Sequence, residues 1–319
     1  MCKLSASQQG LRGGESMAGT SELSPIEDTA RLAPARIRYL GDSDYVTRRY
    51  VSQGAEMNTG DYFDYDCVVR DGMPMRGHFT LDMHGFMLGK HGSSIVDFHD
   101  KAAVDATYLQ EVEELVARLC GASRAAAQGW MIRTSADLTA RAKEKVAGYQ
   151  HSGGIQPPAG EAHVDYNEIT GRRAAARIYA DRFPDGPGYK RYICFSLWRT
   201  FSPGPQDWPL AVCDGRTVNE EETASNTLFV VDEFPTGDAL TAPVEDENQM
   251  IAATIFRYRD RHRWWYFSNM AADDVLLFKF QDSDHSVTWR CPHTAFHDTS
   301  LSDANIRSSI EVRCIAFFE

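Results

Sequence analysis

The fold assignment depends on the stretch EAHVDYN, residues 161–167, and on why His163 and Asp165 stand two positions apart in it. It reads as part of a β-strand, and side chains two positions apart on a strand point to the same face. His163 and Asp165 are therefore expected to lie side by side, which suits a metal ion. In a chain with 10 His and 45 acidic residues, an H-x-[DE] triplet is expected about 1.4 times by chance. The alternative is a surface strand with two exposed polar groups, and only a third ligand could decide between the two.

Four histidines further along the chain are candidates for that third ligand. His262 lies in the charged turn RDRHRWWY and His285 in the polar turn QDSDHS, so both are expected to be solvated. His293 lies among apolar residues in WRCPHTAF, where an unpaired imidazole would be costly to bury. His297 follows beside Asp298, where the predicted strand ends. His293 is therefore the best third ligand by environment, and a hydrogen-bonded core histidine is the alternative.

The stretch RSSIEVR, residues 307–313, has the alternation of another strand. With a period of two, one face carries Arg307, Ser309, Glu311 and Arg313, and the other carries Ser308, Ile310, Val312 and Cys314. If the first face lines a barrel, Arg307 and Ser309 form an anchor for a carboxylate, with a guanidinium fork beside a hydroxyl. If that face meets water, the stretch is an ordinary half-buried strand.

Composition favours a mainly β protein with flanking helices. The chain has 319 residues, of which 43% are hydrophobic and 11% aromatic, and it can bury a large core. An amphipathic helix is predicted over 105–121, with Gly121 as its C-cap, and a second helix within 131–150, with Ser135 as its N-cap. Strands and hairpins are predicted between 35 and 88. Further strands are predicted at 189–201, 209–214, 227–234, 249–259, 263–270, 274–282, 288–296 and 306–318.

The domain organisation follows from these elements. Residues 1–33 are expected to form a disordered tail in which Met17 is an alternative start to Met1, and 34–319 a single domain. Within it, 34–160 would supply N-terminal strands and supporting helices, and 161–319 a barrel or jelly-roll core.

Charge and cysteine content exclude several classes of partner. A net charge of −12 argues against nucleic acid and anionic membranes, and the basic clusters GRRAAAR and RYRDRHR are interpreted as solvated faces. No stretch reaches the roughly 20 apolar residues of a membrane span, and the N-terminus lacks the apolar region of a secretory signal. Seven cysteines without a C-x-x-C pair favour free thiols in a reducing cytoplasm. The oligomeric state is left open.

Several of these stretches together resemble a known family. The motifs HVDY, LWRTF followed by WPLAVCD, DDVLLFKFQDSD, CPHTAFHD and RSSIEVR, with GHFTLDMHGFML and YLQEVEELVARLCGA upstream, resemble the hydroxylase/desaturase family of CmcJ-like, AsaB-like and gibberellin-desaturase-like proteins. The resemblance spans roughly residues 38 to 318. It implies a double-stranded β-helix core of the jelly-roll or cupin-like type, and a dioxygenase that depends on Fe(II), 2-oxoglutarate and O2.

The resemblance also assigns residues and a reaction. It implies that His163, Asp165 and His293 hold the iron, and that Arg307 with Ser309 holds the distal carboxylate of 2-oxoglutarate. The reaction would oxidise an unactivated C–H bond of a small molecule, by hydroxylation, desaturation or ring formation, in natural-product biosynthesis. Two alternatives are a catalytically inactive cupin-like binding protein and a zinc-dependent hydrolase that uses the same triad.

Five further residues are candidates for the substrate pocket. Arg199 lies in an apolar strand, where it would either clamp a carboxylate or form a structural salt bridge. Lys279 raises the same question, with a snorkelling surface lysine as the alternative. Trp198 and Tyr166 could wall the pocket, although aromatic residues are mostly core. With Arg133, these residues suggest a small-molecule substrate that bears a carboxylate.

Overall fold

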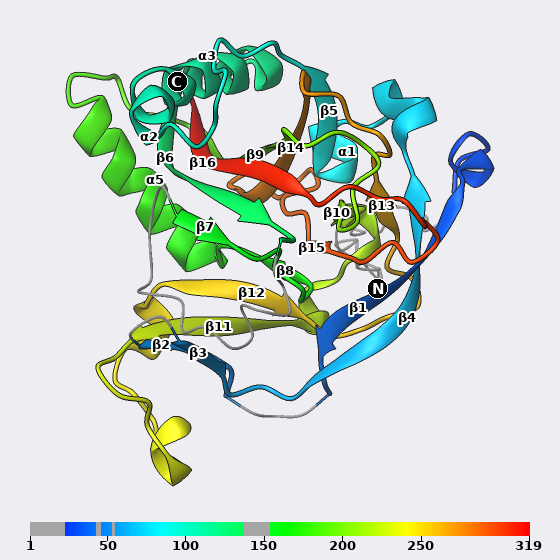
Figure 1. Ribbon diagram of the computed structural model, residues 1–319. Helices are drawn as coiled ribbons and strands as arrows, with labels where there is room; N and C mark the ends of the chain where they lie inside the picture. The colour runs from blue at the N-terminus through cyan, green and yellow to red at the C-terminus, as the bar shows by residue number, and fades with distance from the viewer. Residues whose placement is uncertain (1–22, 43–45, 53–54, 137–153) are drawn as a thin grey trace, which may run out of the picture.

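The strands form two curled sheets that face each other, with helices packed around the smaller sheet (Figure 1). This computed structural model describes residues 23–42, 46–52, 55–136 and 154–319. The larger sheet has the order β1 (Leu32–Leu40), β4 (Tyr62–Asp71), β13 (Trp264–Tyr266), β10 (Leu210–Cys213), β15 (His293–Ala295), β8 (His163–Val164), β12 (Ala252–Phe256), β11 (Thr223–Val230), β2 (Arg48–Ser52) and β3 (Ala55–Asn58). The smaller has the order β5 (Phe86–Lys90), β14 (Asp274–Asp282), β9 (Arg191–Thr200), β16 (Ser308–Phe318), β6 (Arg124–Thr134) and β7 (Gly154–Gln156).

The predicted fold class is confirmed: the protein is mainly β, with the curled sheets of a jelly-roll core. Seven of the eight strands predicted between 189 and 318 contain a strand of the structure, and the eighth, predicted at 227–234, overlaps β11, which begins earlier, at Thr223. The prediction of strands and hairpins was wrong between 73 and 84. There the chain forms the 3-10 turns η2 (Met73–His78) and the short helix α1 (Leu81–His84), and only β5 follows as a strand. Thr80 caps α1 by accepting a hydrogen bond from the Met83 N–H. This cap favours a helical turn here, although apolar and polar residues alternate as they do in a strand.

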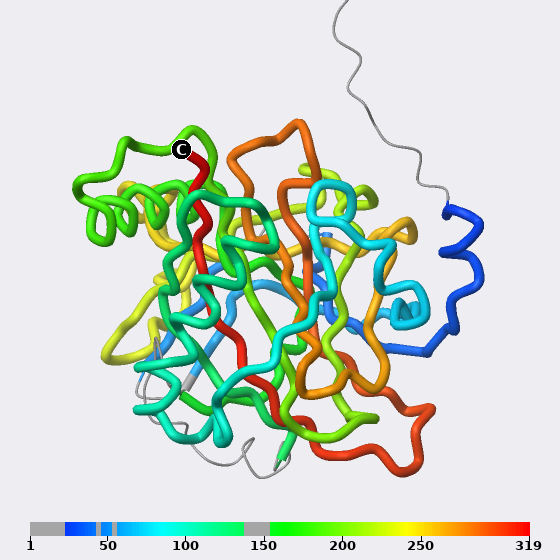
Figure 2. Tube along the Cα trace, turned by 90° about the horizontal axis from the view of Figure 1, so that it is seen from above, coloured from blue at the N-terminus to red at the C-terminus, as the bar shows by residue number. Residues whose placement is uncertain are grey.

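Strand β16 divides the interior of the molecule into two cores. Figure 2 shows this C-terminal strand, in red, running across the molecule. Its residues Ile310, Val312 and Cys314 belong to the core under the helices. Ile315 and Phe317 belong instead to the core between the sheets. The predicted alternation of β16 is therefore present, and the face with Arg307, Ser309, Glu311 and Arg313 turns toward the inside of the barrel.

Helix α3 (Leu109–Cys120) covers the outer face of the smaller sheet. It continues α2 (Lys101–Ala103) and a π-helical turn (Val104–Tyr108), so helical structure begins slightly before the predicted 105. Its end is as predicted, because Gly121 has a φ of 71°, which a residue without a Cβ adopts readily. The second predicted helix falls largely on 137–153, outside the described residues. Ser135 donates a hydrogen bond to Asp207.

Helix α5 (Glu168–Arg182) was not predicted. It begins at Asn167, whose side chain accepts a hydrogen bond from the Thr170 N–H. Its Ala175 and Tyr179 join the core between the sheets, where Tyr179 packs on Phe317. The arginines of GRRAAAR lie on its exposed side, as the solvated-face interpretation requires. The helix therefore covers the end of the barrel at which β16 finishes.

The N-terminal boundary of the domain lies earlier than predicted. Residues 24–33, assigned to the disordered tail, include the 3-10 turn η1 (Glu27–Thr29) and the start of β1. Glu27 and Ala33 are fully buried. A buried carboxylate with partners far away in the chain holds this segment, and such partners leave no local pattern in the sequence. Residues 1–22 lie outside the described residues.

Replacing Leu115 by alanine tests the packing of α3. Leu115 is buried between the helix and the smaller sheet, so Leu115→Ala should lower the free energy of unfolding by about 3 kcal/mol. The exposed Arg118 of the same helix is the control, and Arg118→Ala should change this free energy by less than about 0.5 kcal/mol. Urea denaturation measures both values. Equal stability of the two variants would contradict this packing.

Candidate metal centre

Three side chains converge at the inner face of the larger sheet. His163 on β8 and His293 on β15 are paired across two neighbouring antiparallel strands, and Asp165 follows β8 directly. The Asp165 Oδ1 atom lies 3.3 Å from His163 Nε2 and 3.7 Å from His293 Nε2. The three candidate ligand atoms all lie within 4.8 Å of one another. The structure thus brings together the three residues that the sequence analysis singled out, although β8 ends at Val164, before Asp165.

The backbone sets the orientation of both imidazoles. His163 Nδ1 lies 2.8 Å from the carbonyl oxygen of Glu161, and His293 Nδ1 lies 3.4 Å from that of Cys291. A carbonyl oxygen only accepts hydrogen bonds, so each Nδ1 carries the proton in the neutral ring. The lone pair is then on each Nε2, which points to Asp165. Histidines that bind metals commonly show this arrangement, with the second ring nitrogen donating to a carbonyl or carboxylate.

Arg313 fixes the carboxylate of this group. Its Nε donates a hydrogen bond to Asp165 Oδ2 at 2.7 Å, which leaves Oδ1 facing the imidazoles. Burial raises the pKa of Asp165, but Arg313 and the two histidines outweigh burial and hold that pKa well below its usual value. Asp165 is therefore an anion beside two imidazole nitrogens. Two histidines and one carboxylate on one side of a cation are the donor set of non-haem Fe(II) oxygenases.

The predicted carboxylate anchor lies at the start of β16. Arg307 is 1% exposed, and its Nε donates a hydrogen bond to Ser309 Oγ at 3.0 Å. Its Nη1 donates to the carbonyl oxygen of Trp208, and its guanidinium lies over the Trp198 ring, 5.2 Å from the centroid. Burial, with the nearby charge of Arg133, lowers the pKa of Arg307 to about 9. Among the described residues none forms an ion pair with Arg307, so this buried cation would be stabilised by an anionic ligand.

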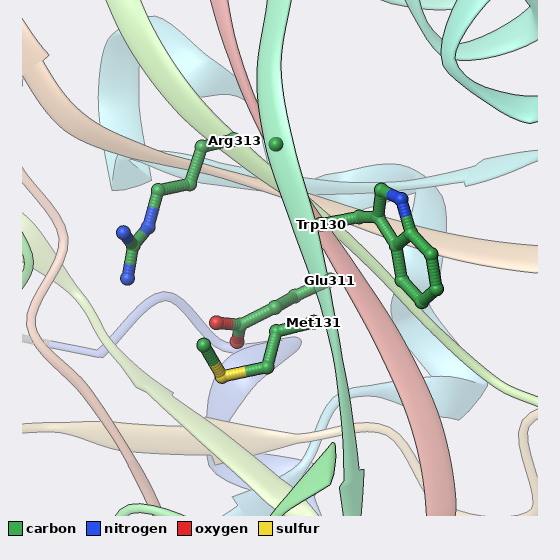
Figure 3. A pocket seen from close by; sticks show the side chains of 5 residues that line it. Trp130, Met131, Glu311 and Arg313 are labelled. Atoms are coloured by element: carbon green, nitrogen blue, oxygen red, sulfur yellow. The ribbon is translucent and has the colours of Figure 1, made fainter. Parts of the chain in front are cut away.

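Charged side chains of β16 and β6 occupy the space between the anchor and the triad. Arg133 holds Glu311 through two contacts of 3.3 Å, one to each carboxylate oxygen. Burial raises the pKa of Glu311, but the charge of Arg133 outweighs it, and the pKa is lowered. Figure 3 shows Arg313, Glu311 and Met131 pointing to the same side of the two strands, while Trp130 points away. These residues line a small cavity. Arg133 therefore lies at the site, with its charge balanced by Glu311.

Besides Arg133, two more of the five pocket candidates lie close to this centre. The Tyr166 hydroxyl donates a hydrogen bond to Gln128 Oε1 at 3.2 Å, and its ring packs on Phe280, which stacks on His293. Trp198 lies under Arg307. Neither residue belongs to an outer surface of the molecule, so both fit the predicted role of wall residues.

Arg199 and Lys279 lie elsewhere. Arg199 shares the outer face of β9 with Leu197, and it contacts His91 Nδ1 and the ring of Tyr108. Its partners are thus an imidazole, carbonyl groups and aromatic rings, and the salt bridge predicted as the alternative is absent among the described residues. Lys279 is fully buried against Asp282 at 2.7 Å, so the snorkelling interpretation was wrong. For both residues, the register of the strand decides which way the side chain points.

The other three histidines considered as third ligands lie partly at the surface and partly in the core. His285 and His297 are exposed and stack on Trp289 and Trp208. The prediction that His262 is solvated was wrong, because its side chain is 2% exposed and Nε2 contacts Glu222 at 2.7 Å. The solvated-face interpretation of RYRDRHR fails with it, since Arg263 is also buried.

A second group with metal-ligating side chains escaped the sequence analysis. Glu27 Oε1 lies 3.5 Å from His78 Nε2 and 3.6 Å from His84 Nε2. Here, however, Arg216 donates a hydrogen bond to the same oxygen at 2.8 Å, and the Thr80 N–H points at His84 Nδ1. The proton of the neutral His84 ring must then be on Nε2. The contacts favour a hydrogen-bonded cluster that anchors the N-terminal segment.

Comparisons with known proteins agree with one another. The family described as an oxidoreductase/YMDC permease-like domain matches residues 37–317. The hydroxylase/desaturase CTB9 of Cercospora beticola is 33% identical over 248 residues, which cover 76% of this chain and 73% of that protein. The Fe(II)/2-oxoglutarate-dependent dioxygenase nvfI of Aspergillus novofumigatus is 29% identical over 261 residues, which cover 77% and 81%. The structure of the iron and alpha-ketoglutarate-dependent endoperoxidase NvfI superposes with a TM-score of 0.71 at 22% identity, covering 90% of this chain and 98% of that one, and so shares the fold.

The described residues include no helix long and apolar enough to cross a membrane.

The cluster around Glu27 predicts a loss of stability in acid. Burial raises the pKa of Glu27, but hydrogen bonds from Ser24 and Arg216 outweigh burial and lower it from 4.5 to about 2. Because the folded pKa lies below the unfolded one, this contribution to stability is present above pH 4.5 and is lost as the pH falls toward about 2. Burial also lowers the pKa of His84 to about 4, so its contribution is lost in the same direction, below pH 6.5.

Glu27→Gln should therefore lower the free energy of unfolding at neutral pH by about 2 kcal/mol, the loss expected for hydrogen bonds to a buried charge. The difference from the natural protein should shrink as the pH falls from about 5 to about 3. The exposed Glu114 provides the control variant, Glu114→Gln. Thermal unfolding over this pH range measures the difference, and a difference that stays constant would rule out the assigned role of Glu27.

Proposed function

The chain belongs to the family described as an oxidoreductase/YMDC permease-like domain, and we propose that it is a non-haem Fe(II)/2-oxoglutarate-dependent dioxygenase. It would oxidise an unactivated C–H bond of a small molecule in natural-product biosynthesis. Relatives named as hydroxylase/desaturases, as dioxygenases and as an aspirochlorine biosynthesis protein support this class. The proposal treats the predicted 34–319, together with the ordered residues 24–33 before it, as one oxygenase domain, because both sheets contain strands from before and after residue 160.

One observation carries the metal assignment. In His163 and His293 the Nδ1 atoms face carbonyl oxygens, and both Nε2 atoms face an anionic Asp165. The three residues fit an Fe(II) ion with open positions for further ligands. The bound iron would supply the activation of O2. The protein's own part is to hold the three donors, and Arg313 keeps the Asp165 carboxylate turned toward them.

The second part of the proposal is the 2-oxoglutarate site. Arg307 is a buried guanidinium without an ion-pair partner among the described residues, and Ser309 Oγ is beside it. A carboxylate could accept hydrogen bonds from the Arg307 guanidinium and from the Ser309 hydroxyl, since a guanidinium fork binds two carboxylate oxygens at once. The other charged residues of the cavity do not compete for this ligand, because Arg133 pairs with Glu311 and Arg313 with Asp165.

The contacts of the arginines also narrow the substrate. A carboxylate-bearing substrate was suggested by Arg133 and Arg199, and these contact Glu311 and His91 instead. We therefore propose a small molecule that the pocket recognises mainly through Tyr166 and the apolar surroundings of His293. The six described cysteines are all free, which supports a reducing, cytoplasmic environment.

The two alternatives make different demands on the site. An inactive cupin-like protein has no need of an intact anchor 14 residues after the third ligand, and a zinc-dependent hydrolase has no use for a buried Arg307 and Ser309. Each would bind a metal without a response to 2-oxoglutarate.

An anaerobic titration of the apo-protein with Fe(II) and then 2-oxoglutarate distinguishes these functions. We expect a visible charge-transfer band that needs both additions. His163→Ala should abolish the band by removing a ligand. Arg307→Ala should raise the dissociation constant of 2-oxoglutarate at least about 30-fold, because it removes the partner of a buried charge.

Arg191→Ala is the control for the removal of a guanidinium. Arg191 lies on β9, is about a quarter exposed and donates from Nε to Asp282, away from the triad and the anchor. This variant should give the band of the natural protein. A folded, metal-binding protein that shows no band with 2-oxoglutarate would overturn the proposed function and favour the binding-protein or hydrolase alternatives.

A further inference from the structure

The indole N–H of Trp198 is a buried hydrogen-bond donor without a partner. The residue is 3% exposed, and Nε1 has no hydrogen-bond acceptor among the described residues. Buried polar groups are nearly always hydrogen-bonded, and a tryptophan placed in a protein interior usually finds an acceptor for its N–H. An unpaired donor next to a ligand site therefore points to an acceptor that the ligand brings.

The strand register places Trp198 between the anchor and the metal centre. On β9 and β16, Thr200 pairs with Ser309, Trp198 with Glu311, and Ser196 with Arg313. Ser309 contacts Arg307 at the anchor, and Arg313 contacts Asp165 at the triad. A cosubstrate that joins these two points has to pass the inner face of β9 beside Trp198.

The carboxylate that the register places opposite Trp198 is not the missing acceptor. Glu311 lies directly across from Trp198, yet both of its oxygens contact Arg133. The Arg307 guanidinium lies over the Trp198 ring, and it too has no anionic partner among the described residues. An unpaired cation and an unpaired donor thus lie against each other. One carboxylate would satisfy both.

We propose that Trp198 Nε1 donates a hydrogen bond to the distal carboxylate of 2-oxoglutarate, the same group that Arg307 holds. Trp198 is then a cosubstrate-binding residue, and its ring supports the guanidinium while its N–H completes the carboxylate site. This inference rests on the proposed function and extends it to a residue outside the R-x-S pattern.

Trp198→Phe tests the hydrogen bond, because phenylalanine lacks the N–H and keeps an aromatic ring beneath the Arg307 guanidinium. We expect the Fe(II)-loaded variant to bind 2-oxoglutarate about tenfold or more weakly in the anaerobic titration, the loss of one hydrogen bond to a charged group. The same titration with 2-oxobutyrate, which has the keto acid but no distal carboxylate, should give equal dissociation constants for variant and natural protein. Isothermal calorimetry on the Zn(II)-loaded protein provides a readout without iron.

Trp265→Phe is the matched control. Trp265 is also buried with an unpaired Nε1, but it lies on β13 against Phe79, among core residues. Its variant should bind 2-oxoglutarate like the natural protein. Unchanged binding in Trp198→Phe, or an equal loss for 2-oxoglutarate and 2-oxobutyrate, would overturn the inference. If the natural protein itself does not bind 2-oxoglutarate, the proposed function fails instead, so the two failures are distinguishable.

Discussion

The pairing of His163 with His293 across two short strands is the constraint on which the metal centre depends. β8 and β15 are antiparallel neighbours, and these two residues stand opposite each other in the register. A slip of one residue would turn either imidazole to the other face of the sheet. The register is held by the flanking strands β10 and β12, which pair with β15 and β8, respectively. The pairing of these strands in the larger sheet thus keeps the Nε2 atoms of His163 and His293 on the inner face of that sheet.

Hydrogen bonds to the far side of each imidazole separate the two His/carboxylate clusters of this molecule. Both clusters have two Nε2 atoms within 3.7 Å of a carboxylate oxygen, so these distances alone do not distinguish them. At the triad the Nδ1 atoms face carbonyl oxygens, whereas His84 Nδ1 faces the Thr80 N–H. The first arrangement leaves a lone pair for a cation, and the second puts the proton on His84 Nε2, the atom that lies 3.6 Å from Glu27 Oε1. A search for ligand atoms should therefore include the partner of the second nitrogen.

The sequence predicts those features whose pattern lies within one short stretch of the chain, and it misses those that depend on contacts between distant residues. The alternation of β16 is visible because apolar and polar residues alternate within one strand, and it correctly placed Arg307 and Ser309 on one face, while which face turns inward was left open. Helix α5 was invisible because its buried residues are Thr170, Gly171, Ala175 and Tyr179, which give almost no apolar period; Asn167 followed by Glu168 was the available signal. The Glu27 cluster joins residues that lie far apart in the chain, and no spacing rule reveals such a group. For Arg199 the strand was predicted correctly, whereas its partners His91 and Tyr108 come from distant parts of the chain and leave no local pattern.

Among the charged side chains inside the barrel, Arg307 differs from the other described residues because it has no ion-pair partner among them. Along the inner face of β16, Arg313 is matched by Asp165, and Glu311 by Arg133. Each pair joins β16 to another element, so each charge is balanced within the protein before any ligand binds. Arg307 is the exception among the described residues of this face, and its neighbour Trp198 keeps an unpaired N–H. Leaving both groups unsatisfied in a dry interior is costly. We propose that a ligand that carries an anion to this position offsets that cost, and the two unpaired groups then indicate a carboxylate as the group that binds there.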